Sequence, residues 1–320
     1  MAYETGTWLN PSDGLDKIRI FLLAQGWTVD AFTVEAPGKR LHMHKGAFYL
    51  NMKSADSTAS NIWPDYLGAI GVQIGFNVGT GYTSANAWRD QPGVVATAAG
   101  LSIGGAIPLP AGAITSYRFD YDDAYKSLVI YVQTQPGVWR WGGFGESLLK
   151  AGAWTGGGWV ASSSNYKMVG YPYDIGHSNS LAAYPFGANS DASTNYPLVY
   201  VRADVDAFTG KWISCSPGDF TGKTGDTCLR GGQPVGANTP SFTTLLDRAR
   251  NAMNSLSVLL PVQVFAVRDA GGISLLGTLP NVFVTNISGM VPGQSYQQGV
   301  DWFTPFPGDT ATRGTVVKRV

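Results

Sequence analysis

The feature that most constrains this chain is a series of short segments in which apolar and polar side chains alternate, separated by turn-forming residues. Successive side chains of a β-strand point to opposite faces of its sheet, so such alternation predicts half-buried strands. Strands at this spacing predict a mainly β fold of antiparallel, sandwich-like sheets. The expected strands lie near residues 28–34, 40–52, 69–78, 117–121, 128–134, 138–144, 196–205, 258–268, 282–287 and 314–320.

Two segments show the different spacing of an amphipathic helix. Apolar side chains recur every three or four positions in residues 11–25 and again in residues 240–256. Ser12 is the expected N-cap of the first helix, and Gly26 is suited to end it. The fold class predicted from the sequence is therefore mainly β with an α+β element: two short helices packed on the sheets.

The chain has 320 residues, which is enough for one large or two ordinary domains. Residues 1–165 contain the first helix and the clearest strands, and we expect them to form an antiparallel β region. Residues 166–320 are predicted to form a second β region, with one helix and a long loop at residues 214–240 that contains both cysteines.

Composition excludes several partners. The 22 basic and 22 acidic side chains give a formal net charge of zero, and only 14% of residues are charged. A nucleic-acid binder usually carries a basic excess, and a disordered chain is poor in the aromatic residues that make up 12% here. No run approaches the roughly 20 apolar residues of a membrane-spanning helix, and the first residues lack a signal-peptide pattern. We therefore expect no nucleic-acid or membrane partner, and synthesis in a cytoplasm.

Motifs that would indicate catalysis are weak. A Gly-x-Ser-x-Gly pattern occurs at residues 100–104, but two prolines follow where the hydrolase elbow requires a helix. His42 and His44 share one face of a predicted strand, which suits a metal only if a third ligand approaches, and an exposed strand face is the simpler interpretation. The acidic run at residues 120–123 fits a solvated hairpin turn better than a calcium loop. We predict no catalytic, cofactor-binding or metal-binding residues; a polysaccharide hydrolase using scattered aspartates is the enzymatic alternative.

Cys215 and Cys228 are the only two cysteines. A disulfide closing the loop between them would contribute about 3 kcal/mol in the loop-entropy model. A reducing cytoplasm instead favours two free thiols. Both states remain open at this stage.

Large aromatic side chains in predicted loops and strand ends have three interpretations. They can fill the space between sheets, anchor a subunit interface, or stack on a sugar. The candidates for an interface or a glycan contact are Trp63, Trp88, Trp139, Trp154 and Trp159.

A series of short stretches runs through the first half of the chain, at residues 5–7, 15–19, 22–28, 41–46, 49–54, 80–82, 88–93, 141–145 and 150–157, with an echo at 302–303. Taken in this order, they resemble the virion structural proteins of tailed bacteriophages. The resemblance covers residues 5–165, and residues 170–240 do not share it.

This resemblance implies a non-enzymatic virion component, made in the cytoplasm of the bacterial host. Such a protein assembles through symmetric interfaces with copies of itself and with other virion proteins. A tail, baseplate or neck position is favoured. The alternatives are a capsid decoration or minor capsid protein, and a carbohydrate- or host-receptor-binding module on the virion that contacts a host surface glycan.

Overall fold

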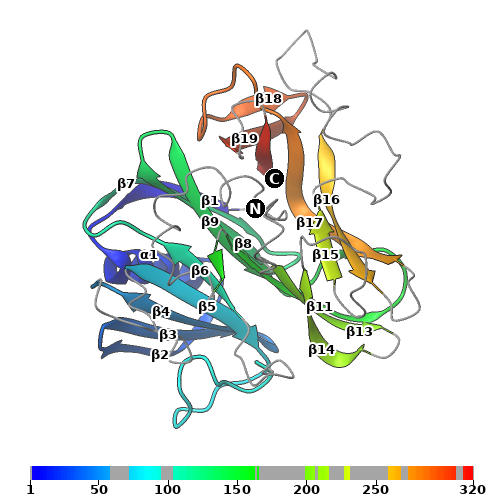
Figure 1. The fold of residues 1–320 in the computed structure, drawn as a ribbon. Coiled ribbons are helices and arrows are strands. Elements are labelled where there is room, and N and C mark those ends of the chain that lie inside the picture. The colour runs from blue at the N-terminus through cyan, green and yellow to red at the C-terminus, as the bar shows by residue number, and fades with distance from the viewer. Residues whose placement is uncertain are drawn as a thin grey trace, which may run out of the picture.

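The computed structural model describes residues 2–57, 72–94, 104–162, 164–165, 199–205, 208–215, 227–230, 259–267, 273–307 and 313–319. Within them the chain is mainly β, with one helix and two sheets (Figure 1). The predicted fold class is confirmed. The second helix expected at residues 240–256 lies outside the described residues. No helix in the described part of the chain has the length and apolar character needed to cross a membrane.

The smaller sheet, sheet B, has the strand order β12-β6-β5-β4-β3-β2, and all its neighbours pair antiparallel. Its strands are β2 (Thr28–Glu35), β3 (Gly38–Lys45), β4 (Phe48–Ala55), β5 (Gln73–Gly79), β6 (Gly105–Pro108) and β12 (Ser164–Asn165). The single strand expected over residues 40–52 is wrong. Gly46 adopts a φ of 63° there and turns the chain into the β3–β4 hairpin, a conformation that glycine tolerates without strain.

The larger sheet, sheet A, has 14 strands, with the order β1-β7-β8-β9-β11-β13-β14-β15-β16-β17-β20-β19-β18 and with β10 paired to β17. Its first part contains β1 (Ala2–Trp8), β7 (Ile114–Asp122), β8 (Ser127–Gln135), β9 (Val138–Gly145), β10 (Leu149–Lys150) and β11 (Thr155–Ser162). It continues through β13 (Val199–Val205), β14 (Phe208–Cys215), β15 (Thr227–Arg230), β16 (Leu260–Val267), β17 (Ile273–Asn286), β18 (Tyr296–Gln298), β19 (Asp301–Pro307) and β20 (Arg313–Arg319).

Sheet A therefore includes strands from both sides of residue 165, where the sequence placed a boundary between two regions. Strand β11 from the first region pairs directly with β13 from the second. The division into two regions remains a prediction.

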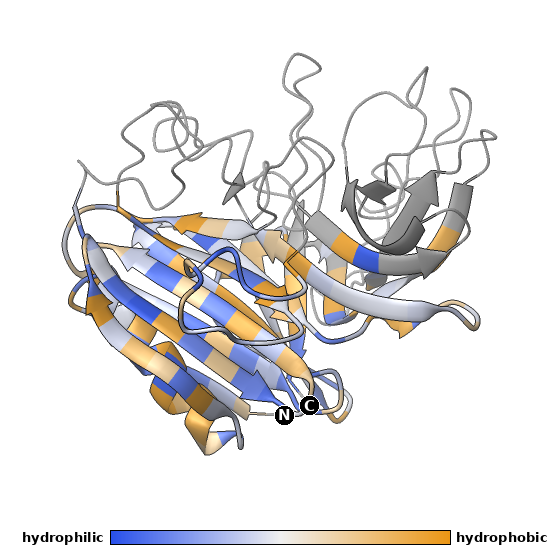
Figure 2. Ribbon diagram, turned by 90° about the horizontal axis from the view of Figure 1, so that it is seen from below, coloured by the Kyte–Doolittle hydropathy of each residue, from blue (hydrophilic) through white to orange (hydrophobic). Residues whose placement is uncertain are grey.

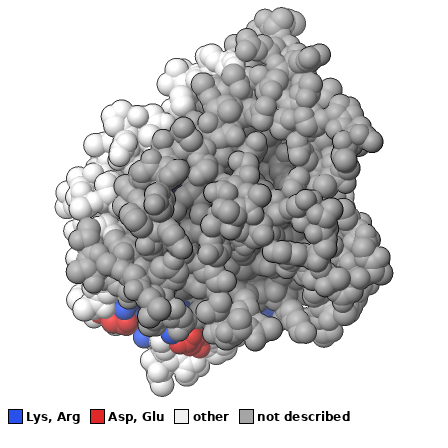
Figure 3. All heavy atoms as spheres, in the orientation of Figure 1, with Lys and Arg blue, Asp and Glu red and all other residues white. Residues whose placement is uncertain are grey.

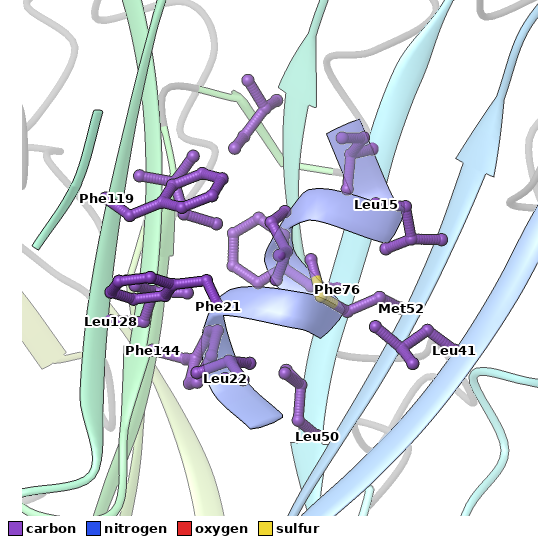
Figure 4. Packing of buried hydrophobic residues seen from close by; sticks show 14 of the residues in the cluster. Leu15, Phe21, Leu22, Leu41, Leu50, Met52, Phe76, Phe119, Leu128 and Phe144 are labelled. Atoms are coloured by element: carbon purple, nitrogen blue, oxygen red, sulfur yellow. The ribbon is translucent and has the colours of Figure 1, made fainter. Parts of the chain in front are cut away.

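The main core lies between sheet B and the β7–β9 part of sheet A, with helix α1 (Pro11–Ala24) inserted between them (Figure 4). Phe76 of β5 packs directly against β9 of the facing sheet. A Cβ atom on Gly142 of β9 would lie 2.6 Å from the Phe76 ring. Glycine at position 142 thus lets the aromatic ring fill the space that a side chain would otherwise occupy.

Helix α1 begins and ends as its sequence predicts, apart from the N-cap. Asn10, and not Ser12, is the cap: its Oδ1 accepts a hydrogen bond from the backbone N–H of Asp13 at 2.8 Å. At the other end, Gly26 has a φ of 80°, and the N–H of Trp27 donates to the carbonyl of Leu22, which completes a Schellman motif.

The opposite face of sheet A is covered by C-terminal strands. Phe306 of β19 stacks on Tyr131 of β8 with ring centroids 3.4 Å apart, and Trp139 of β9 meets the same ring edge-on. Near the two chain ends, which lie close together in Figure 1, the Arg319 guanidinium stands 3.6 Å from the Tyr3 ring centroid. This part of sheet A thus carries a packed layer on each face.

Candidate functional site

The outer face of sheet B, which points away from the core, carries polar side chains that are nevertheless buried. Side chains alternate along each strand, so the apolar neighbours Leu41, Met43 and Leu50 face the core while His42 and Asn51 face outward. His42, Asn51 and Asn77 are almost fully enclosed. Burying uncompensated polar groups is costly, so these residues require hydrogen-bond partners.

A compact loop of residues 80–93 covers this face. Its ends meet where the Thr80 N–H donates to the Pro92 carbonyl at 2.8 Å, as in an Ω-loop. Gln91 organises its interior: the amide accepts from the Thr83 N–H and donates to the carbonyls of Thr83, Asn86 and Ala87. Figure 2 shows the loop in front of the strands of sheet B. The loop is therefore held in one shape by its own hydrogen bonds.

A chain of side-chain hydrogen bonds runs across the sheet beneath the loop. Arg40 Nε donates to His42 Nε2 at 2.5 Å, and His42 Nδ1 lies 2.6 Å from Asn51 Oδ1. Asn51 Nδ2 then donates to Asn77 Oδ1 at 2.9 Å, and Asn77 Nδ2 donates to the Arg89 carbonyl at 3.3 Å. We call these four side chains, Arg40, His42, Asn51 and Asn77, the polar network.

The polar network joins the sheet to the loop at three places. Arg40 Nη2 donates to the Asn86 carbonyl at 2.8 Å, Asn77 reaches the Arg89 carbonyl, and the Tyr82 ring lies over His42 with centroids 4.8 Å apart. These contacts link residues that are far apart in sequence, and they fix where the loop sits on the sheet.

The directions of these bonds determine the state of His42. A guanidinium can only donate, so Nε2 must accept and Nδ1 must carry the hydrogen that Asn51 Oδ1 accepts. Burial of the ring lowers the pKa of His42 to about 4; the hydrogen bond with Asn51 opposes this shift and the charge of Arg40 adds to it. The ring is therefore neutral at pH 7.

Glu35 compensates the two cations at the edge of the network. Lys53 forms a short ion pair with Glu35, and Arg40 Nη1 lies 3.5 Å from the same carboxylate. Partial burial alone would raise the pKa of Glu35, but Lys53 and Arg40 outweigh it and hold this pKa below its ordinary value. The Glu35 carboxylate therefore balances the positive charges of Lys53 and Arg40.

This arrangement positions the loop on the sheet. In the described ranges, no group of three or more His, Cys, Asp or Glu side chains is placed to hold a metal ion. His42 and His44 do share a strand face, as expected, but the expectation of an exposed face is wrong for His42, which the loop covers. His44 lies at the rim, 2.9 Å from Asp30.

The other polar sequence motifs are not brought to this site. Asp122 and Asp123 lie at the β7–β8 turn, as predicted, but Asp120 is a buried strand residue whose carboxylate pairs with Arg118 through two hydrogen bonds of 2.6 and 2.7 Å. Ser102, the centre of the Gly-x-Ser-x-Gly pattern, lies outside the described residues.

The aromatic candidates fall into different classes. Trp88, Trp139 and Trp159 are buried inside the chain, so the core interpretation describes them and no open ring surface is left for a glycan or a partner. Trp154 is partly exposed; its Nε1 donates to the Leu276 carbonyl, and Lys150 Nζ lies 5.0 Å from its ring centroid. Trp63 lies outside the described residues.

The two cysteines lie on neighbouring strands. Cys215 ends β14 and pairs in parallel register with Thr227, the residue before Cys228 in β15. Part of the predicted 214–240 loop is therefore strand. A disulfide and a pair of free thiols remain the two alternatives that the sequence allows.

Sequence reasoning missed the polar network. Asn51 and Asn77 alternate in phase with His42, and asparagine is depleted in strands, which is a signal for a special role. Comparison of the sequence with protein-family models and with curated proteins found no match. The site is therefore interpreted from its own geometry.

Proposed function

We propose that the chain is a non-enzymatic structural component of a tailed-phage virion, in the tail, baseplate or neck, that assembles with copies of itself and with other virion proteins. The proposal rests first on the resemblance of residues 5–165 to such proteins. The structural observation that carries it furthest is a set of large apolar side chains left in solvent at two separate parts of the surface.

The first set of exposed apolar side chains lies on or beside α1 and the edge strand β2: Leu9, Ile20, Leu23 and Val34. The second set lies on the β18–β19 hairpin and the segment before it: Val291, Val300 and Trp302. Exposure ranges from 41% at Leu23 to 91% at Val300. Exposed apolar surface of this kind is typical of interaction sites, and two different surfaces suit a subunit with more than one neighbour.

The surface charge supports the same proposal. On the face shown in Figure 3, acidic and basic side chains of the described residues lie beside one another along the lower edge. Ion pairs such as Lys318–Asp301, at 2.9 Å, join opposite charges at the surface. With zero net charge, little long-range repulsion opposes the packing of many copies.

Mass spectrometry of purified particles tests the proposal. Particles of a phage that encodes this chain are banded on a density gradient and then separated into heads and tails. We expect peptides of this chain in the tail fraction, at a constant ratio to a known tail protein, while host ribosomal peptides report contamination. Recovery in heads alone would assign it to the capsid, and its absence from all particles would overturn the proposal.

A further inference from the structure

The loop of residues 80–93 is held on sheet B through a network that contains one imidazole ring with an unprotonated nitrogen able to take up a proton. His42 uses its unprotonated Nε2 to accept from Arg40, and Arg40 in turn donates to the Asn86 carbonyl of the loop. The Tyr82 ring of the loop covers the same imidazole. His42 Nε2, together with the more distant Glu35 carboxylate, thus orients the guanidinium that binds the loop.

We propose that His42 is a proton-operated latch: protonation of Nε2 releases the loop of residues 80–93 from the outer face of sheet B. The added hydrogen removes the acceptor that Arg40 Nε uses, and it brings two positive charges to hydrogen-bond distance. Arg40 must then turn away, and its bond to the Asn86 carbonyl is lost with it. Asn51 keeps its bond from Nδ1–H, so the sheet side of the network stays formed.

The groups around His42 determine whether protonation is opposed or compensated. The charged and titratable side chains that face it are Arg40 and His44 of β3, Asp30 and Glu35 of β2, Lys53 of β4, and Tyr82 of the loop. Asp30 and Glu35 would favour an imidazolium, but Asp30 is paired with His44 and Glu35 with Lys53 and Arg40. Neither carboxylate neutralises the new charge while the loop stays closed.

The size of the effect follows from linkage. In the closed loop the pKa of His42 is about 4, and once the loop leaves and water reaches the ring it should return toward its ordinary value of 6.5. The open state then gains protons that the closed state does not. Between pH 7.5 and pH 4.5 the equilibrium constant for loop opening should rise about 70-fold.

Hydrogen exchange read by mass spectrometry on the full chain measures this opening directly. After correction for the intrinsic pH dependence of exchange, we expect amides of residues 80–93 to lose protection by tens of fold between pH 7.5 and pH 4.5. Amides of β8, in the core, exchange only through global unfolding and should remain far better protected than the loop at every pH. If the loop amides exchange no faster than those of β8 across the range, the loop opens only when the whole protein unfolds and the latch is wrong.

Three variants separate the latch from a general acid effect. His42→Gln cannot be protonated, so its loop should show no change with pH. His44→Gln is the matched control: His44 lies on the same strand and face but contacts Asp30 and Tyr49, and the wild-type transition should remain.

Asn51→Asp places a carboxylate beside His42 Nδ1. It should stabilise the imidazolium inside the closed loop and raise the closed-state pKa of His42 toward its open-state value, so the acid-driven rise in loop opening should be much smaller than in wild type. This provides a test even if His42→Gln fails to fold. An undiminished rise in Asn51→Asp, or a persisting transition in His42→Gln, would overturn the proposal. The latch does not depend on the virion assignment, because the exchange experiment needs only the isolated protein.

Discussion

Removing the Phe306 ring should destabilise the whole protein, because that ring joins the C-terminal strands to the N-terminal sandwich. Phe306 of β19 is fully buried; it stacks on Tyr131 of β8 and meets Trp139 of β9 edge-on. The contacts link residues about 170 positions apart in the chain. The variant Phe306→Ala removes this link and leaves a cavity between the layers.

The expected loss is large. Substituting alanine for a fully buried phenylalanine costs about 3–5 kcal/mol, which includes both the lost transfer free energy and the cavity. Within that figure, the two aromatic contacts are worth about 0.5–1.5 kcal/mol each beyond their area. We expect the free energy of unfolding, from urea titration followed by circular dichroism, to fall by about 3–5 kcal/mol with an unchanged dependence on urea.

Trp302→Ala provides the matched control. Trp302 is an aromatic residue of the same strand and the same strand face, but its side chain is 42% exposed, so its removal should cost about 1 kcal/mol. If Phe306→Ala is no more destabilising than Trp302→Ala, the C-terminal layer does not stabilise β8 and β9, and the described packing is wrong. A transition that splits into two would show instead that the two layers unfold separately.

Three further predictions concern single buried groups. Asp120→Asn leaves the buried Arg118 guanidinium without its anion and should lower the unfolding free energy in urea by about 3–5 kcal/mol. Gly145→Ala places a Cβ 2.8 Å from Trp159 Cε2, so it should cost about 1–3 kcal/mol, visible as a lower melting temperature in calorimetry. The lowered pKa of His42 contributes stability that is present above pH 6.5 and lost as pH falls through about 4; between pH 7.5 and pH 4.5, urea titrations should show wild type losing about 2.5 kcal/mol more than His42→Gln.

The sequence predicts a helix or strand well where the spacing of its apolar side chains, or a single residue such as a capping glycine, determines its limits. Helix α1 ends at Ala24, close to the expected residue 25, because the apolar spacing and Gly26 both act within a few residues. The β3–β4 hairpin was missed because alternation continues through a turn as short as Gly46 and its neighbour. Period alone cannot separate one long strand from two short ones joined in this way.

The candidate site could be predicted only in part, because its burial comes from a distant segment. Alternation correctly places His42 and His44 on one face opposite Leu41 and Met43. It cannot say that residues 80–93, about 40 positions later, cover that face at His42 and leave His44 at the rim. A strand pattern reports which side chains share a face, and tertiary packing decides whether that face meets water.

The polar character of the covered face has a physical consequence for the loop. An apolar surface under residues 80–93 would hold them by area alone, and that attachment would not change with pH. Here Asn51 and Asn77 fill positions where strand-forming apolar residues would pack more simply, and their amides align His42 and the Arg89 carbonyl. Each buried amide needs its partners, so the loop fits the sheet in one register. The same network makes the attachment conditional on a single proton, because the Arg40 bond to the loop depends on an unprotonated His42 Nε2.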